Sequence, residues 1–299
     1  MLLLTGATGL VGAAVLRALV AEGAEVRCLV RDSRRLGAQR VRVQIALGDL
    51  ADPPSFRNAL RGVDTVVHLA GSVRDQPRGS IEELNGIATW RMVEAAERSG
   101  VERFVFFSAL GSATHQRARF FRAKALAEQA VRDSRLPSTV VFAPSIVYAP
   151  GDRRLTLLER LALLPLVPVS GRGRAVYEPI WAEDAADCVT SWLRTSNGHQ
   201  SQVDGHQRYE LAGPQQLSYN DIVHTVLASL NRNRPLVHIP TSIVSRTLRL
   251  LEASWRPGAF ATWDEAELLE VSMISARGSA DAESLGVTPQ PMPAVLGTR

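Results

Sequence analysis

The chain has little cysteine, and its two cysteines are not placed to form a cluster. Cys28 and Cys188 form no C-x-x-C pair, and no group of histidines follows at metal-ligand spacing. A disulfide framework requires several cysteines, and a structural zinc site requires closely spaced Cys or His ligands. The sequence therefore indicates neither a disulfide scaffold nor a metal site.

Long apolar runs and basic patches are also lacking. No stretch approaches the roughly 18 to 20 consecutive apolar residues that a membrane-spanning helix needs. The 34 basic and 30 acidic residues give a formal charge of only +4, and the arginines are scattered rather than gathered as on a nucleic-acid-binding face. We therefore expect no membrane span and no nucleic-acid partner.

The amino terminus leaves little room for a targeting peptide. Residues Leu2 to Leu4 already have the composition of a first strand, and a glycine turn follows directly. A secretory signal needs about 15 to 30 residues before the mature fold. We therefore expect a cytoplasmic protein.

The first half of the chain contains a regular alternation of short apolar runs and longer amphipathic stretches. This alternation is typical of βαβ units around a parallel sheet. The stretches at 11–22 and 85–99 have helical periodicity, and each is followed by a glycine, a common residue just past a helix end. We predict an α/β fold with a doubly wound parallel sheet, whose six strands are Leu2–Leu4, Glu25–Val30, Arg42–Leu47, Thr65–Leu69, Phe104–Phe107 and Thr139–Phe142.

The second half has a different texture, which begins at the Pro- and Gly-rich piece from Pro144 to Gly151. We predict a Rossmann core at residues 1–150 and, at residues 151–299, a smaller, mostly helical lobe interleaved with the core. Such a lobe would lie beside the carboxyl ends of the strands, where substrate pockets form. The helices predicted for the lobe are residues 156–164, 183–194, 218–230 and 241–255.

The region from Thr241 to Arg256 has apolar residues on one helical face and arginines elsewhere. Two interpretations are open. The helix packs on the lobe and points its arginines to water, or it makes a peripheral contact with a membrane. This region is also the best candidate for a surface that contacts a protein partner.

A glycine-rich turn, Thr5 to Gly12 (TGATGLVG), follows the first strand and opens the first helix. In this context it is a dinucleotide-binding motif, because the amides at the helix N-terminus face the pyrophosphate. Gly6 allows the tight turn, Gly9 lets the backbone approach the pyrophosphate, and Gly12 lets the helix lie close to the sheet. The predicted phosphate-binding residues are Gly6, Thr8, Gly9, Leu10, Val11 and Gly12.

The end of the second strand favours NADP(H) over NAD(H). Arg31 stands there, with Arg34 and Arg35 close behind, and guanidinium groups suit the 2′-phosphate of NADP(H). An acidic residue at this point would instead bind a ribose 2′-hydroxyl. Asp32 offers such a carboxylate one position later, so NAD(H) stays open.

Two further turns lie where a dinucleotide would pass. Asp49 and Leu50 follow the third strand, at the adenine end of the cofactor. Leu69, Ala70 and Gly71 follow the fourth strand, beneath the nicotinamide half. Simple turn chemistry explains the same residues equally well.

These motifs, together with Phe106-Phe107-Ser108 and the segment Ala143 to Tyr148 (APSIVY), resemble the atypical and extended short-chain dehydrogenase/reductases. The resemblance covers nearly the whole chain and is strongest for the branch that contains the NADPH-binding accessory subunit of respiratory complex I. It implies that Pro144 and Ile146 also contact the cofactor. Ala143 stands where members that act on nucleotide sugars tend to carry Arg, so a sugar-nucleotide enzyme is less favoured.

The resemblance also implies a Ser-Tyr-Lys site, in which the lysine holds the ribose, the tyrosine passes a proton and the serine positions the substrate oxygen. Ser108 and Lys124 match this pattern and are expected to contact the cofactor. The tyrosine position holds Phe120, which has no proton to give. The candidates for a replacement donor are Tyr148, after the sixth strand, and Tyr177, His115 or water.

Three functions are compatible with this site. The protein is an NADPH-dependent oxidoreductase that acts on a small carbonyl or enone compound. Alternatively, it holds the cofactor without turnover as an accessory protein that binds a partner, or it senses the redox state of NADP(H). Asn85 matches a site asparagine of the superfamily, although it could equally cap the helix that follows.

Overall fold

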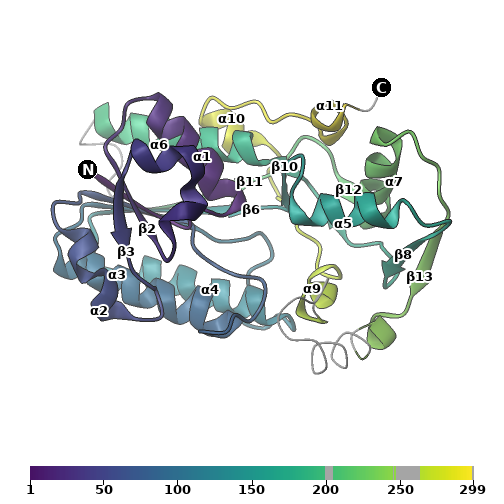
Figure 1. Ribbon diagram of the computed structural model, residues 1–299, viewed down its shortest axis with the longest axis horizontal. Coiled ribbons are helices and arrows are strands. Elements are labelled where there is room, and N and C mark those ends of the chain that lie inside the picture. Colours follow the sequence, from purple (N-terminus) through teal and green to yellow (C-terminus); the bar gives the residue numbers. More distant parts are fainter. Residues whose placement is uncertain (199–204, 245, 247–262, 298–299) are drawn as a thin grey trace.

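The computed structural model describes residues 1–198, 205–244, 246 and 263–297. It confirms the α/β fold, with a parallel seven-stranded sheet in the order β11-β6-β5-β4-β1-β2-β3 and helices on both faces (Figure 1). The six predicted strands are all present close to their expected bounds, and β11 (Gly205–Leu211) is a seventh. The six are β1 (Leu2–Thr5), β2 (Val26–Val30), β3 (Gln44–Leu47), β4 (Thr65–His68), β5 (Arg103–Phe107) and β6 (Ser138–Pro144).

The sequence does not predict the seventh strand, β11. Between Gly205 and Leu211, only Tyr209 and Leu211 are apolar. As the outer strand of the sheet, β11 pairs on one side only, with β6. An edge strand can keep polar side chains that a fully buried parallel strand excludes. The second half of the chain therefore supplies a strand to the core sheet.

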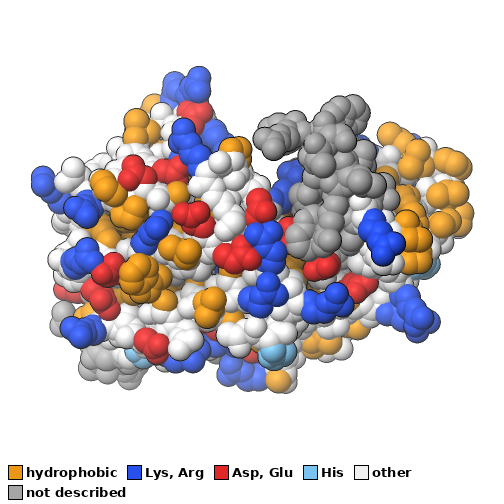
Figure 2. Space-filling view, turned by 90° about the horizontal axis from the view of Figure 1, so that it is seen from below, with side chains coloured by type: hydrophobic (Ala, Val, Ile, Leu, Met, Phe, Trp, Pro, Cys, Tyr) orange, Lys and Arg blue, Asp and Glu red, His pale blue; other side chains and the backbone are white. Residues whose placement is uncertain are grey.

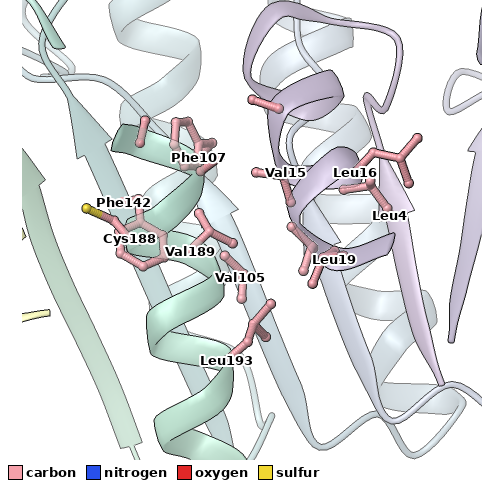
Figure 3. Packing of buried hydrophobic residues seen from close by; sticks show 14 of the residues in the cluster. Leu4, Val15, Leu16, Leu19, Val105, Phe107, Phe142, Cys188, Val189 and Leu193 are labelled. Carbon is pink, nitrogen blue, oxygen red and sulfur yellow. The ribbon is translucent and has the colours of Figure 1, made fainter. Parts of the chain in front are cut away.

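Two helices from opposite halves of the chain cover one face of the sheet. α1 (Leu10–Ala21) packs along α6 (Ala182–Gly198). Figure 3 shows Val15 and Leu19 of α1 and Val189 of α6 in one apolar cluster with side chains of the strands behind them. Cys188 lies in the same cluster, and burial raises the pKa of its thiol to about 12. This cysteine therefore acts as a core residue.

The other face carries α3 (Ala88–Arg98) and α4 (Arg119–Arg132), which lie below the sheet in Figure 1. A π-helical turn, η3 (Glu83–Ile87), leads into α3. The remaining short elements of the core are α2 (Pro53–Phe56) and the 3-10 helices η1 (Ser33–Val41) and η2 (Arg57–Leu60).

The lobe is mostly helical, as predicted, and three two-stranded ribbons complete it. α5 begins earlier than predicted because Asp152 caps it, accepting hydrogen bonds from the amides of Arg154 at 2.7 Å and Leu155 at 2.9 Å. The helices are α5 (Arg153–Leu161), α7 (Tyr219–Ser229), α9 (Trp263–Leu268), α10 (Ala280–Ser284) and α11 (Met292–Leu296). The ribbons are β7 (Val147–Tyr148) with β10 (Ile180–Trp181), β9 (Val176–Tyr177) with β12 (Leu217–Ser218), and β8 (Val167–Ser170) with β13 (Leu236–Ile239).

Most of the helix predicted at 241–255 lies outside the described residues. Among the helices that are described, none has the length and apolar character to cross a bilayer.

Candidate functional site

The predicted cofactor turns meet at the carboxyl edge of the sheet. The chain proceeds from β1 outward through β2 and β3, and then returns to the other side of β1 with β4. Neighbouring strands β1 and β4 thus form the topological switch point, where ligands of open α/β sheets bind. Their two turns touch, since the amide of Leu69 donates to the carbonyl of Thr5 at 3.2 Å.

The glycines of the first turn are required by close backbone contacts. Gly6 has a φ of +75°, and a Cβ there would lie 2.6 Å from the amide nitrogen of Ala70. A Cβ at Gly12 would lie 2.0 Å from the carbonyl oxygen of Gly6. The start of α1 is therefore pressed against the turn, which is the role that the sequence predicts for Gly12.

The N-terminus of α1 is open to an anion. The helix begins at Leu10, and its cap residue, Gly9, has no side chain to bond the first amides. No acidic residue lies in the first turn. The first amides of a helix have no partner within the helix, and they carry partial positive charge. A pyrophosphate therefore fits this end of α1.

The acidic and basic side chains after β2 differ in how far they are already engaged. Asp32 caps η1 by accepting from the Arg34 amide at 3.0 Å, and its carboxylate pairs with the Arg34 guanidinium at 3.0 and 3.1 Å. These bonds to Arg34 hold the pKa of Asp32 below its usual range. Arg31 is exposed, and its guanidinium makes no ion pair with any described residue. The carboxylate is thus engaged, whereas the guanidinium is open to a ligand.

Asp49 stabilises the turn after β3 by local hydrogen bonds. Its amide donates to Ser55 Oγ at 2.8 Å, and its Oδ1 accepts from the amide of Ala51 at 3.1 Å. Arg78 approaches the other carboxylate oxygen at 3.7 Å. Leu50 packs partly buried beside the core. Contact of Asp49 and Leu50 with the adenine stays a prediction.

Asn85 fixes the turn after β4 and does not cap a helix. Its Nδ2 donates to the carbonyls of Ser72 and Ile81, both at 2.7 Å, and its Oδ1 accepts from the Ser72 amide at 3.2 Å. A side chain at Gly71 would collide with Asn85 Oδ1 at 2.6 Å. The cap interpretation is therefore wrong, because Asn85 lies inside η3.

A buried hydrogen-bond chain links the glycine turn to α3. Thr89 gives its one hydroxyl proton to the Asn85 carbonyl at 2.6 Å, so it accepts from His68 Nε2 at 3.2 Å. His68 Nδ1, 2.9 Å from Thr5 Oγ1, is then the acceptor for the Thr5 hydroxyl. Burial, together with the charge of Lys124, lowers the pKa of His68 to about 3. The imidazole is thus a neutral structural link, which the sequence analysis did not foresee.

Lys124 is the only lysine in the sequence. It is buried on α4. Its Nζ donates to the Phe107 carbonyl at 2.6 Å and lies 4.8 Å from the centre of the Phe106 ring. A Cβ at Gly71 would lie 3.3 Å from the same Nζ, so the ammonium lies directly beside this turn. Lys124 is thus placed beside the predicted path of the nicotinamide half.

Burial lowers the pKa of Lys124 to about 8, and the nearby Glu128 carboxylate raises it in part. Between pH 8 and 10.5 the unfolded chain therefore binds a proton that the folded chain has lost, so the free energy of unfolding rises with pH. We expect the stability of the wild type relative to Lys124→Met to increase by about 3 kcal/mol across this window. Chemical denaturation at several pH values measures this difference.

A direct measurement is also available, because protein labelled with nitrogen-15 lysine gives one side-chain signal to titrate by NMR. A difference between wild type and variant that stays constant with pH, or a lysine that titrates above pH 10, would contradict the assigned environment.

Ser108 donates its hydroxyl proton to Glu128, which the sequence analysis missed. Glu128 stands one helical turn after Lys124 on α4, and Arg208 of β11 donates to its second oxygen at 3.3 Å. A serine has one proton to donate. Ser108 would have to give up Glu128 before it could donate to a substrate oxygen.

Phe120 lies beside Lys124, and its ring is partly buried. The ring packs edge-to-face on Phe121, at 5.6 Å between centres, and Lys124 Nζ lies 5.8 Å from its centre. Leu268, Val271 and Met273 join the same cluster. The structure thus brings Ser108, Phe120 and Lys124 together, and apolar residues of the lobe join the cluster on which Phe120 packs.

Tyr148 lies in the apolar cluster of the lobe with Leu155 and Leu158. Its hydroxyl is buried and has no hydrogen-bond partner among the described residues. Burial raises the pKa of the phenol, and the charge of Asp184 raises it further. The other suggested donor, Tyr177, already donates to the Leu269 carbonyl at 2.8 Å. Within the described part of the chain no hydrogen bond joins Tyr148 to Lys124, so the role of Tyr148 as proton donor stays a prediction.

Two arginines of the core hold α9 over this region. Arg74, after β4, binds Glu265 with both Nε and Nη2 at 2.6 Å. Arg119, at the start of α4, contacts Asp264 at 3.4 Å, Glu82 at 2.6 Å and Asp75 at 3.0 Å. We call this set the α9 clasp. It fastens the helix whose last residue, Leu268, packs on the same cluster as Phe120.

Residues 6–160 match the model of the NAD(P)H-binding family. The chain is 30% identical over 194 residues to ceramide reductase of Caulobacter vibrioides, an alignment that covers 64% of this chain and 60% of the relative. It is 27% identical over 262 residues to the 40 kDa subunit of the mitochondrial NADH-ubiquinone oxidoreductase of Neurospora crassa, with 84% and 66% covered. The chain thus spans about 60 to 66% of the length of these two relatives.

Solved structures share the fold at low sequence identity. An NADPH-dependent quinone oxidoreductase from Escherichia coli, in complex with NADPH, aligns with a TM-score of 0.75 at 14% identity and covers 99% of both chains. UDP-glucose 4-epimerase of Thermus thermophilus, in complex with NAD, aligns with a TM-score of 0.71 at 18% identity and covers 99% of this chain and 97% of the other. Both cofactors occur among these neighbours, so the fold alone does not select one.

Proposed function

Because this chain belongs to the NAD(P)H-binding family, we propose that it binds NADP(H) across the carboxyl edge of its sheet. The uncapped start of α1 would receive the pyrophosphate, since its amides have no side-chain competitor. The open guanidinium of Arg31 would receive the 2′-phosphate, whereas Asp32 is engaged by Arg34. Lys124 would hold the ribose of the nicotinamide half. The bound cofactor would supply a hydride to an acceptor that can reach it.

We further propose that the chain holds NADP(H) as an accessory or sensing component and does not reduce carbonyl compounds through a Ser-Tyr-Lys site. One arrangement supports this function above all. Phe120, which has no hydroxyl, occupies the position of the proton donor and packs in the small apolar cluster around Phe121. In addition, Ser108 donates its hydroxyl proton to Glu128. The site therefore has the groups that bind the cofactor but no positioned acid for the product alkoxide.

Restoring the phenol tests this proposal. We expect the wild type to oxidise NADPH with a panel of aldehydes, ketones and enones no faster than buffer does. Phe120→Tyr places a hydroxyl beside Lys124, so we expect it to raise carbonyl reduction by about 10²-fold over that background. Phe120→Leu is the matched control, because it alters the ring without adding a proton and should stay at background. The measurement is the loss of reduced-nicotinamide absorbance.

A second candidate is a working reductase, and the lowered pKa of Lys124 favours it. An ammonium with a pKa of about 8 can release a proton near neutral pH more readily than an ordinary lysine. In that case the wild type reduces a carbonyl or enone compound, and Phe120→Tyr leaves the rate unchanged because the proton comes from Lys124. This outcome would overturn the holding role and establish the reductase.

A further inference from the structure

One end of the lobe exposes a patch of apolar side chains. Two segments form it, residues 160–167 at the end of α5 and residues 230–237 before and within β13. We call this patch the lobe tip. Figure 2 shows hydrophobic side chains gathered at the end of the molecule that carries β8 and β13 in Figure 1. Its exposed apolar residues are Leu163, Leu164, Leu166, Leu230 and Val237, and Leu163 is 65% exposed.

The two segments are held side by side by backbone contacts. The amide of Val167 donates to the Pro235 carbonyl at 3.0 Å, and β8 continues in parallel register with β13. Arg232 Nη1 donates to the carbonyl of Ala162 at 3.1 Å. The exposed leucines therefore belong to one continuous surface. Single exposed leucines are ordinary on protein surfaces, but a contiguous group marks an interaction site.

The core of the lobe does not need these leucines. α5 buries Leu155 and Leu158, the turn after it buries Ala162, and the chain next enters the core at Val167. The residues between Ala162 and Val167 project outward, although three of them are leucine. Each of these three leucines is at least 42% exposed. The leucines are therefore explained by a contact that the described residues of the lobe do not make.

The charges of the lobe tip are of one sign. Arg160, Arg232 and Arg234 lie in the two segments, which contain no Asp or Glu; the acid that comes nearest in the sequence, Glu159, stands just before the first of them. A second copy of the chain would bring these arginines against their equivalents, which disfavours self-association. Anionic lipid headgroups attract such side chains, while apolar side chains enter the region beneath the headgroups.

We propose that the lobe tip docks the protein on the surface of an anionic lipid bilayer. The leucines enter the interface, and the arginines lie at the level of the headgroup phosphates. Because the lobe tip lies at the opposite end of the molecule from β2 and β3 (Figure 1), docking leaves the Arg31 end of the nucleotide site facing away from the membrane. Nucleotide binding and membrane docking are thus separable properties of this chain.

Cosedimentation of the full chain with vesicles tests the proposal. The vesicles are phosphatidylcholine, with or without phosphatidylglycerol. We expect the wild type to bind only the anionic vesicles and to release as salt is raised. The triple variant Leu163→Gln, Leu164→Gln, Leu166→Gln should bind on the order of 100-fold more weakly. Leu126→Gln, an equally exposed leucine on α4 at 55%, is the matched control and should bind like the wild type.

Thermal unfolding and NADPH affinity should be the same in all three proteins, which excludes misfolding as the cause. Equal vesicle binding by the wild type and the triple variant, or no binding by the wild type, would overturn the proposal. So would a concentration-dependent dimer of the wild type in lipid-free buffer that the triple variant abolishes, because the lobe tip would then be an interface between copies.

Discussion

From the proposed binding of the 2′-phosphate by Arg31, we expect Arg31→Asp to lower the affinity for NADPH on the order of 100-fold and to leave the affinity for NADH nearly unchanged. A guanidinium bonded to a phosphate dianion is lost, and a carboxylate that repels the phosphate takes its place. The same carboxylate can accept from the 2′-hydroxyl of NADH, which offsets part of any other loss. Equilibrium titration of the two reduced nucleotides, followed by their fluorescence, measures both affinities.

Arg42→Asp is the control for charge alone. Arg42 is exposed and precedes β3, so it lies toward the amino edge of the sheet, away from the predicted site. The Arg42→Asp variant makes the same change of charge as Arg31→Asp. It should alter NADPH affinity by no more than about twofold, because exposed charges at long range are screened. Equal losses of NADPH and NADH affinity in Arg31→Asp would show that Arg31 does not bind the 2′-phosphate.

Gly12→Ala should abolish nucleotide binding within the measurable range and destabilise the fold. The added methyl would lie 2.0 Å from the Gly6 carbonyl oxygen and 2.7 Å from its carbon. These are backbone atoms, so α1 itself has to move away from the turn. We expect a loss of about 3 kcal/mol in the free energy of unfolding, together with at least a 100-fold loss of NADPH affinity, because the helix amides leave their positions.

Gly23→Ala is the control that replaces a glycine of the same helix without creating a backbone collision. Gly23 ends the same helix with a φ of +73°, and nothing lies within 4 Å of an added Cβ. Its replacement should cost about 1 kcal/mol of strain and leave NADPH affinity intact. If Gly12→Ala binds NADPH as tightly as Gly23→Ala, the close approach of α1 is not what shapes the site.

The parts of the site that the sequence predicts are those set by local geometry. The turn Thr5 to Gly12 can be recognised in the sequence because a tight turn, a close helix and an open helix start each need glycine at a fixed spacing. Arg31 is predictable for the same reason, since it directly follows a strand whose pattern is clear. Ser108, Phe120 and Lys124 come from the resemblance, and the structure places them side by side.

The parts that the sequence does not predict depend on contacts between distant segments. Arg74 and Glu265 are 191 residues apart in the chain, and nothing local marks either as a partner. The bond from Ser108 to Glu128 is visible only once β5 lies against α4. Likewise, β11 has the polar pattern of an edge strand, and its position beside β6 follows from the whole topology rather than from its own residues.

The α9 clasp joins α9 to the core directly beside Phe120, because Arg119 precedes Phe120 in the chain. Leu268, Val271 and Met273 pack on the same small cluster as Phe120. Arg74 and Arg119 fasten the helix that ends at Leu268. A fastened α9 beside the nucleotide suits the proposed retention of the cofactor, whereas a segment that opens in each cycle suits a rapid reductase.

The most direct test of the central claim is the fate of NADPH bound to the purified wild type. The absorbance of reduced nicotinamide is followed after adding aldehydes, ketones, enones and quinones, with free NADPH as the reference. We expect one NADPH bound per chain and, for every compound, oxidation no faster than that of free NADPH. Rapid oxidation by any of them, with repeated turnover on further NADPH, would contradict the account and identify the chain as a working reductase.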